Sequence, residues 1–195
     1  TVNNNYKAKV KKEQSNLKLI KNPQGLIDRA VFLLSSKSYI NRVLALAALT
    51  GRRVAEIGCT AEFIPFSENI VVFKGQLKTK GKECKDYKIP LLSTTKPIIT
   101  CLKGMRLDMP QYINNPATFH SNCSKELSLR VKKHFSEFVE GDITAKDLRA
   151  IYATIACAKY KKDNRKTPQC YYSEILGHSE DDLNTCNSYF DFYLE

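Results

Sequence analysis

The sequence lacks several features that would place it in common classes of protein. It contains no tryptophan, only three histidines, and seven cysteines that are never closer together than 13 residues. Because zinc ligands lie only a few residues apart, this spacing predicts no metal site, and the odd, scattered set indicates reduced thiols of an intracellular protein. No apolar run approaches the roughly 20 residues of a membrane span, and no signal-peptide pattern opens the chain. We therefore expect a cytoplasmic protein with no membrane association.

Positive charge is what the sequence has in excess. Lys and Arg number 31 against 20 Asp and Glu, which gives a formal net charge of +11 over 195 residues. The excess is concentrated in three segments, 6–21, 74–90 and 159–166. Clustered basic residues are typical of proteins that bind a polyanion, of which DNA or RNA phosphate is the first candidate. The alternative is a lysine-rich composition with solvated charges and no such partner.

Hydrophobic periodicity predicts a mainly helical α+β domain around a small antiparallel sheet. We expect residues 1–24, which are polar and lysine-rich, to form a basic linker or arm, and residues 25–195 to form one domain, a fragment of a longer chain. The strand-like runs 70–73 and 87–91 enclose a lysine-rich stretch with two glycines, which predicts a β-hairpin. Helices are expected at 25–35, 38–50, 94–105, 124–140, 145–161 and 168–177, with a short one from 54, a loop over 106–123 and a helical or irregular tail.

Four short segments carry residue types that suit one chemistry. They are TGRRVAEI at 50–57, the lysine-rich hairpin at 74–90, KDLRAIYA at 146–153, and LGHS at 176–179 followed by Tyr189. Two arginine forks can bind the non-bridging oxygens of a phosphodiester, and a tyrosine can attack its phosphorus. A lysine can protonate the leaving 5′ oxygen, so this chemistry needs no metal and no other cofactor. Taken singly, each segment also has a plainer interpretation as surface charge, amphipathic packing or a helix stop.

In this order and spacing, the four segments resemble the catalytic domain of the tyrosine recombinases, and most closely that of the telomere resolvases (protelomerases). The resemblance covers about residues 40–193. It implies a tyrosine-recombinase-like fold and DNA breakage and reunion through a 3′-phosphotyrosyl link, which forms closed hairpin telomeres on linear replicons without metal or ATP. It also implies six catalytic residues, which are Arg53, Lys78, Lys146, Arg149, His178 and the nucleophile Tyr189.

Two departures from the common recombinase pattern favour the telomere resolvases. Lys146 stands three residues before the second arginine, where most tyrosine recombinases have histidine, and the tyrosine follows His178 by 11 residues. Some choices stay open. Lys80 or Lys82 could take the part of Lys78 as general acid, and Tyr193 is an alternative nucleophile.

The resemblance further implies double-stranded DNA with an inverted-repeat telomere site as the partner, bound by a dimer. Two alternative functions remain: a site-specific integrase of the same superfamily, which would yield recombinant products, and a DNA-binding domain that cuts nothing. Beside the catalytic set, we expect the DNA to contact seven basic residues, which are Arg52, Lys80, Lys82, Lys159, Lys161, Lys162 and Arg165.

Overall fold

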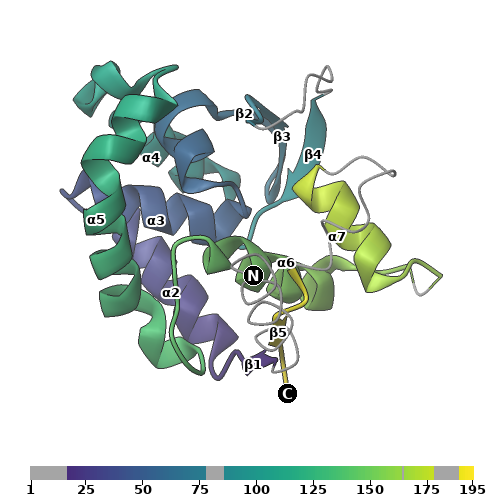
Figure 1. Ribbon diagram of the computed structural model, residues 1–195. Helices are drawn as coiled ribbons and strands as arrows, with labels where there is room; N and C mark the ends of the chain where they lie inside the picture. Colours follow the sequence, from purple (N-terminus) through teal and green to yellow (C-terminus); the bar gives the residue numbers. More distant parts are fainter. Residues whose placement is uncertain (1–16, 78–85, 164, 178–188) are drawn as a thin grey trace, which may run out of the picture.

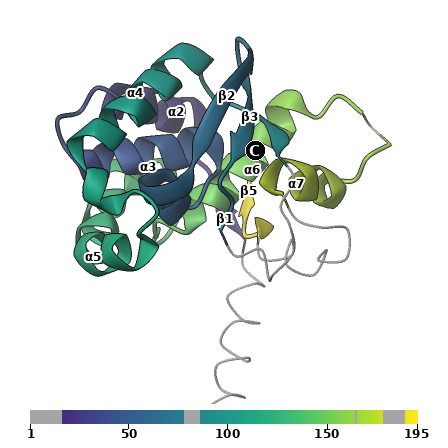
Figure 2. The same cartoon turned by 90° about the horizontal axis from the view of Figure 1, so that it is seen from above.

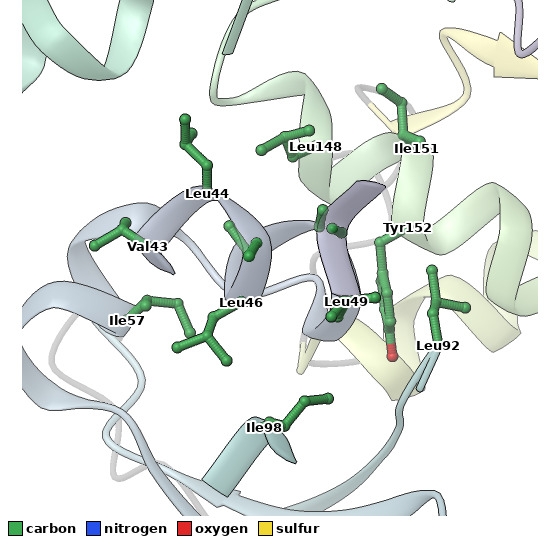
Figure 3. Close-up of a cluster of buried hydrophobic side chains, with 14 of the residues drawn as sticks. Val43, Leu44, Leu46, Leu49, Ile57, Leu92, Ile98, Leu148, Ile151 and Tyr152 are labelled. Atoms are coloured by element: carbon green, nitrogen blue, oxygen red, sulfur yellow. The ribbon is translucent and has the colours of Figure 1, made fainter. Parts of the chain in front are cut away.

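Helix α3 (Tyr39–Thr50) is the centre of the fold in the computed structural model, which describes residues 17–77, 86–163, 165–177 and 189–195. Its sequence, YINRVLALAALT, has apolar or small residues on every face, and ten of its twelve residues are buried. It therefore packs on α2, α4, α5 and α6 at once. Figure 3 shows the resulting core, in which Leu44 and Leu46 of α3 lie among side chains of the neighbouring segments.

Helices α2, α4, α5 and α6 surround α3, whereas α7 packs on α6 and the sheet at the other side of the molecule (Figure 1). Six predicted helices are confirmed, each within a few residues of its expected ends except the one predicted at 124–140. The helical elements other than α3 are α2 (Pro23–Leu33), the π-helix η1 (Glu56–Thr60), α4 (Thr95–Asp108), the 3₁₀ turn η2 (Pro110–Tyr112), α5 (Pro116–Phe135), the 3₁₀ turn η3 (Ser136–Phe138), α6 (Asp147–Tyr160) and α7 (Pro168–Leu176). None of the helices in the described part of the chain is long and apolar enough to cross a membrane.

Helix α5 corrects the predicted loop over 106–123. It begins at Pro116, because Asn115 caps its first turn by accepting a hydrogen bond from the Thr118 N–H, and proline is well suited to the first helical position. Its buried residues recur every four positions, at Phe119, Cys123, Leu127, Val131 and Phe135. The polar residues between them hid this stripe, so the prediction placed the start eight residues too late.

The antiparallel sheet has the order β2-β3-β4 (Glu62–Ser67, Ile70–Lys74, Tyr87–Pro90). The predicted pairing of the second and third strands is confirmed, with Phe73 opposite Tyr87. The sequence did not indicate β2, because five of its six residues are exposed and Pro65 interrupts any alternating pattern. Seen from above, the sheet stands between the helices α2 to α5 and helix α7 (Figure 2).

A second, two-stranded sheet joins the two ends of the described chain. Strand β1 (Lys18–Leu19) pairs in parallel with β5 (Phe192–Tyr193), and Ile20 is only 2% exposed. Residues 17–24 thus belong to the folded domain, so the predicted arm over residues 1–24 is too long. Residues 1–16 lie outside the described residues.

Gly51 ends helix α3 and turns the chain toward α6. Its φ of +66° is a left-handed conformation that favours glycine, and a Cβ atom placed there would lie 2.1 Å from a ring carbon of Tyr152. Only glycine therefore lets the chain pass this close to α6 at the point where the 50–57 motif begins.

Substitution of Gly51 by alanine should destabilise the protein strongly. We expect the free energy of unfolding to fall by about 2–4 kcal/mol, the sum of left-handed backbone strain and overpacking. Gly104→Ala is the matched control, since Gly104 lies inside α4 and its new Cβ would be 3.7 Å from Nη1 of Arg42, an ordinary van der Waals contact. It should stabilise by up to about 1 kcal/mol. Urea denaturation measures the free energy of unfolding of both variants. Equal changes in Gly51→Ala and Gly104→Ala would contradict this role of Gly51.

Candidate active site

In the motif at 50–57, which begins at the last residue of α3, neighbouring side chains point in different directions. Arg52 points into the protein, Arg53 is half-buried, and Glu56 is fully buried at the start of η1. The π-helix is a rare geometry that occurs mostly at functional sites. Here its first residue, Glu56, brings a carboxylate between three arginines.

Glu56 is the centre of the site. Its Oε1 accepts hydrogen bonds from Nη1 of Arg53 at 2.6 Å and from the Leu77 N–H at 3.2 Å. Its Oε2 accepts from the Arg53 N–H at 2.9 Å and lies 4.0 Å from Nη1 of Arg149. The carboxylate thus ties together the first arginine, the second arginine and the residue that immediately precedes Lys78 in the sequence.

Arg149, the third residue of α6, holds its guanidinium in a fixed position. It is 4% exposed, and it donates from Nη1 to the Gly51 carbonyl and from Nη2 to the Leu176 carbonyl, both at 2.7 Å. Its Nε donates to the hydroxyl of Tyr189 at 3.2 Å, and its guanidinium carbon lies 5.5 Å from the centre of that ring. The predicted second arginine and the predicted nucleophile are therefore in direct contact.

The charges around Glu56 shift one another's pKa values. Burial raises the pKa of Glu56, but the positive charges of Arg149, Arg52 and Arg53 more than offset this, so the pKa lies below its ordinary value. Burial lowers the pKa of Arg53, but the charge and hydrogen bond of Glu56 outweigh it, and the net shift is upward. The pKa of Arg149 is lowered by burial and by the neighbouring Arg52. Glu56 thus remains a buried carboxylate that compensates the arginines.

The predicted DNA contact of Arg52 is wrong, because this side chain is 1% exposed. Its guanidinium donates to the hydroxyl of Tyr87, to the Ile175 carbonyl at 2.6 Å and, from Nε, to the Thr50 carbonyl at 3.2 Å. It also lies 4.9 Å from the centre of the Phe73 ring. All of these partners lie inside the protein, so Arg52 is a structural residue that joins the sheet to α7.

The last turn of α7 is held by side chains from the sheet and its flanks. Tyr87 donates to the Leu176 carbonyl at 3.2 Å, and Gln76 donates to the Gly177 carbonyl at 2.9 Å. Gly177 has a φ of +68° and lies against Tyr87, so a side chain would not fit there. The residue immediately before His178 is thereby fixed to the two ends of the hairpin that contains Lys78.

The sequence interpretation assigned no role to Glu56, Gln76 or Tyr87. A sequence signal for Glu56 existed, because this acidic residue lies three residues after Arg53 inside the motif at 50–57. Gln76 and Tyr87 flank the hairpin, and nothing in their local sequence marks them as ligands of a helix end. Their role at the end of α7 becomes visible only from the packing of α7 against β4.

The other predicted site residues fall into two groups. Lys146 is exposed at the start of α6, three residues before Arg149. Lys159 in the last turn of α6 is exposed, as are Lys162 and Arg165 beyond the helix. Lys161 is half-buried, and its amine donates a hydrogen bond to the Asp163 carbonyl at 3.2 Å. Four predicted residues lie outside the described residues, and these are Lys78, Lys80, Lys82 and His178.

No cluster of three metal-ligating side chains occurs in the part of the chain that the structure describes.

The chain matches the family model of the telomere resolvase ResT/TelK catalytic domain over residues 16–192. It is 33% identical over 164 residues to the protelomerase of Yersinia phage PY54, a match that covers 77% of this chain and 26% of that protein. The chain therefore spans about a quarter of the length of this curated relative.

Solved protelomerase structures share the fold. A tyrosine-to-alanine variant of protelomerase TelA, covalently complexed with substrate DNA, superimposes with a TM-score of 0.89 at 25% identity, over 99% of this chain and 65% of that one. An arginine-to-alanine variant of TelA with a DNA hairpin product gives 0.88 at 24% identity, over 99% and 65% of the two chains. Protelomerase TelK complexed with substrate DNA gives 0.82 at 24% identity and covers 41% of its chain. These likenesses agree with the predicted tyrosine-recombinase-like fold.

Replacement of Glu56 by glutamine should remove an acid-sensitive part of the stability. Since the pKa of Glu56 is lowered in the folded protein, unfolding takes up a proton, and its contribution is complete above the ordinary glutamate value of about 4.3. That contribution is lost as the pH falls through the lowered pKa. We expect Glu56→Gln to cost about 3–5 kcal/mol at pH 7 and progressively less below about pH 4.

Urea denaturation between pH 3 and pH 7 measures this difference. Glu126→Gln is the control, because Glu126 forms a partly exposed ion pair with Arg130 on the surface of α5. It should cost less than about 1 kcal/mol at any pH. A Glu56→Gln deficit that stays constant over the whole range would show that the charge of Glu56 does not compensate the arginines.

Proposed function

This chain belongs to the telomere resolvase family, and from that membership we propose that it breaks and rejoins DNA through a covalent bond to Tyr189, leaving covalently closed hairpin ends. The family model spans nearly the whole chain. One variant of protelomerase TelA is covalently complexed with substrate DNA, and another is complexed with a DNA hairpin product. We extend to this chain the covalent DNA chemistry and the hairpin product of these relatives.

The contact between Arg149 and Tyr189 carries the proposal. A phenol attacks phosphorus only when its oxygen lies among cations that can accommodate the charge it passes to the phosphate. The donor nitrogen Nε of Arg149 lies 3.2 Å from the hydroxyl oxygen of Tyr189. Of the tyrosines in the described residues, Tyr189 is the one whose hydroxyl accepts a hydrogen bond from an arginine of the motif at 146–153.

The reaction proceeds by exchange of one phosphodiester for another. The oxygen of Tyr189 forms a bond to the scissile phosphorus, and the bond to the 5′ oxygen of the next nucleotide breaks. Arg53 and Arg149 bind the non-bridging oxygens, with His178 and Lys146 as further donors. Lys78 protonates the leaving 5′ oxygen, while the phenolic proton passes to solvent or a nearby base. The 3′-phosphotyrosyl ester retains the energy of the broken bond, so resealing needs no ATP.

The DNA partner follows from the family and from the charge. We propose an inverted-repeat telomere junction bound by two copies of the protein, each of which cuts one strand. Each cut strand end then joins the complementary strand and closes a hairpin. Lys159 in the last turn of α6 and Lys162 and Arg165 beyond it are exposed and basic, which supports a role for them in binding phosphates outside the cleavage site.

Substitution of Tyr189 by phenylalanine should abolish covalent complex formation and leave DNA affinity within about twofold, because the hydroxyl is lost and the ring remains. The substrate is an inverted-repeat duplex selected from a random pool by its binding to the protein, incubated without metal or ATP and resolved on a denaturing gel. Tyr193→Phe is the matched control and should cleave at the unaltered rate.

Each outcome distinguishes one candidate function. Hairpin products that depend on Tyr189 support telomere resolution, whereas recombinant products would assign an integrase. Covalent complex at the unaltered rate in Tyr189→Phe would overturn the assignment of the nucleophile. No covalent complex in the unaltered protein, with DNA bound, would favour a domain that binds DNA without cutting it.

A further inference from the structure

The segment that follows Tyr189 is held at three consecutive residues, by α7, by β1 and by the hydrophobic core. The ring of Phe190 stacks on that of Tyr172 in α7, with centroids 4.7 Å apart and planes at 7°. The carbonyl of Asp191 accepts a hydrogen bond from the Lys18 N–H of β1 at 2.8 Å. Phe192 is buried in the core. The position of the nucleophile therefore depends on contacts made just after it in the chain.

Strand β1 provides the main-chain part of this anchor. The Lys18 and Ile20 N–H groups both donate to the segment, to the carbonyls of Asp191 and Tyr193 at 2.8 and 3.0 Å. Among the described residues, β1 is the only strand that pairs with β5. Without β1, the segment after the nucleophile would keep ring contacts but lose its strand partner.

The other side of β1 is tied to the loop before α6. The Glu140 N–H donates to the Leu19 carbonyl at 2.8 Å, and Ile20 forms an antiparallel bridge with Val139. The amine of Lys18 donates to the Asp142 carbonyl at 2.8 Å. Because β1 is bonded on both sides, it links the segment after Tyr189 to the chain that leads into the helix of Arg149.

We propose that β1 is a positioning element for the nucleophile: by pairing with β5 it holds Tyr189 against Arg149, and the Lys18 N–H is the positioning group nearest the reaction. The inference rests on the proposed function, since it concerns the same tyrosine. Lys18 does not touch the DNA phosphate in this scheme and acts through the main chain of residues 191–193.

The main-chain hydrogen bond between β1 and β5 lies close to the nucleophile. The bonded carbonyl of Asp191 is only two residues from Tyr189. A shift of β1 along the strand direction, by one residue or less, would move the hydroxyl of Tyr189 away from the guanidinium of Arg149. Misplacement of a reacting group by 1 Å can cost about a hundredfold in rate. The rate of cleavage should therefore depend on the pairing of β1 with β5.

The test removes a single main-chain donor. Lys18→Pro deletes the N–H that bonds Asp191, and Lys18 is the first residue of β1, a position at which strands admit proline. Two controls match it. Leu19→Pro removes an N–H that faces Glu140 at 3.4 Å, away from β5, and Lys18→Ala keeps the N–H and removes the amine.

We expect Lys18→Pro to lower the single-turnover rate of covalent complex formation at saturating DNA by about tenfold or more, with the Kd for DNA within about twofold. Leu19→Pro and Lys18→Ala should stay within about threefold in rate. A Lys18→Pro protein that cleaves at the unaltered rate, or controls that lose as much as Lys18→Pro, would overturn the proposal while the role of Tyr189 stood.

Amide hydrogen exchange gives a second test that does not depend on cleavage, and its first part uses the unaltered protein. In the unaltered protein, the Lys18 and Ile20 amides should be protected, because both are bonded to the segment after the nucleophile. Exchange of both at the rate of an unstructured peptide would overturn the proposal even if the protein cleaves DNA. In Lys18→Pro, exchange over 189–195 should accelerate while that of α3 stays unchanged. Equally accelerated exchange in α3 would overturn the proposal, because β1 would then support the whole fold and not specifically the position of Tyr189.

Discussion

A buried carboxylate between three arginines is the constraint on which the site depends. Three guanidiniums brought together inside a protein would repel one another and lose their hydration, and removal of a single partner from such a set costs several kcal/mol. Glu56 lies at their centre with no exposed surface, bonded to Arg53 and 4.0 Å from Arg149. The positive charge that a phosphodiester requires is therefore concentrated without being left uncompensated.

The arginines also hold the backbone of the site together. Arg149 bonds the carbonyls of Gly51 and Leu176, and Arg52 bonds that of Ile175, so that the end of α3 and the end of α7 are joined through guanidiniums. A helix C-terminus has unpaired carbonyls and a partial negative charge, which makes it a natural partner for such groups. The same interactions place Leu77 and Gly177 beside the site, and these residues directly precede Lys78 and His178 in the sequence.

The sequence predicted most of the fold because its local signals agree with the final packing. The apolar residues of α3, the strand runs at 70–73 and 87–91, and the glycines after α3 and α7 each mark an element that the structure contains. It did not reveal β1, β2 or β5. These strands are short or exposed, and the pairing of β1 with β5 joins residues from opposite ends of the chain, which no local pattern records.

The same distinction holds for the site. The resemblance of the motifs selected Arg53, Arg149 and Tyr189 as candidates, and the structure brings the last two into contact. It could not tell which of two adjacent arginines points inward, because that depends on the turn at Gly51. The sequence therefore assigned Arg52 to DNA, whereas the structure buries it against Phe73 and Tyr87.

The central claim is that DNA becomes bonded to one particular phenol oxygen beside Arg149. Tandem mass spectrometry of the covalent complex, after digestion of the protein and the DNA, locates the nucleotide adduct among the tyrosines that follow α6. The account predicts the adduct on Tyr189 alone. An adduct on Tyr171, Tyr172 or Tyr193 would contradict it.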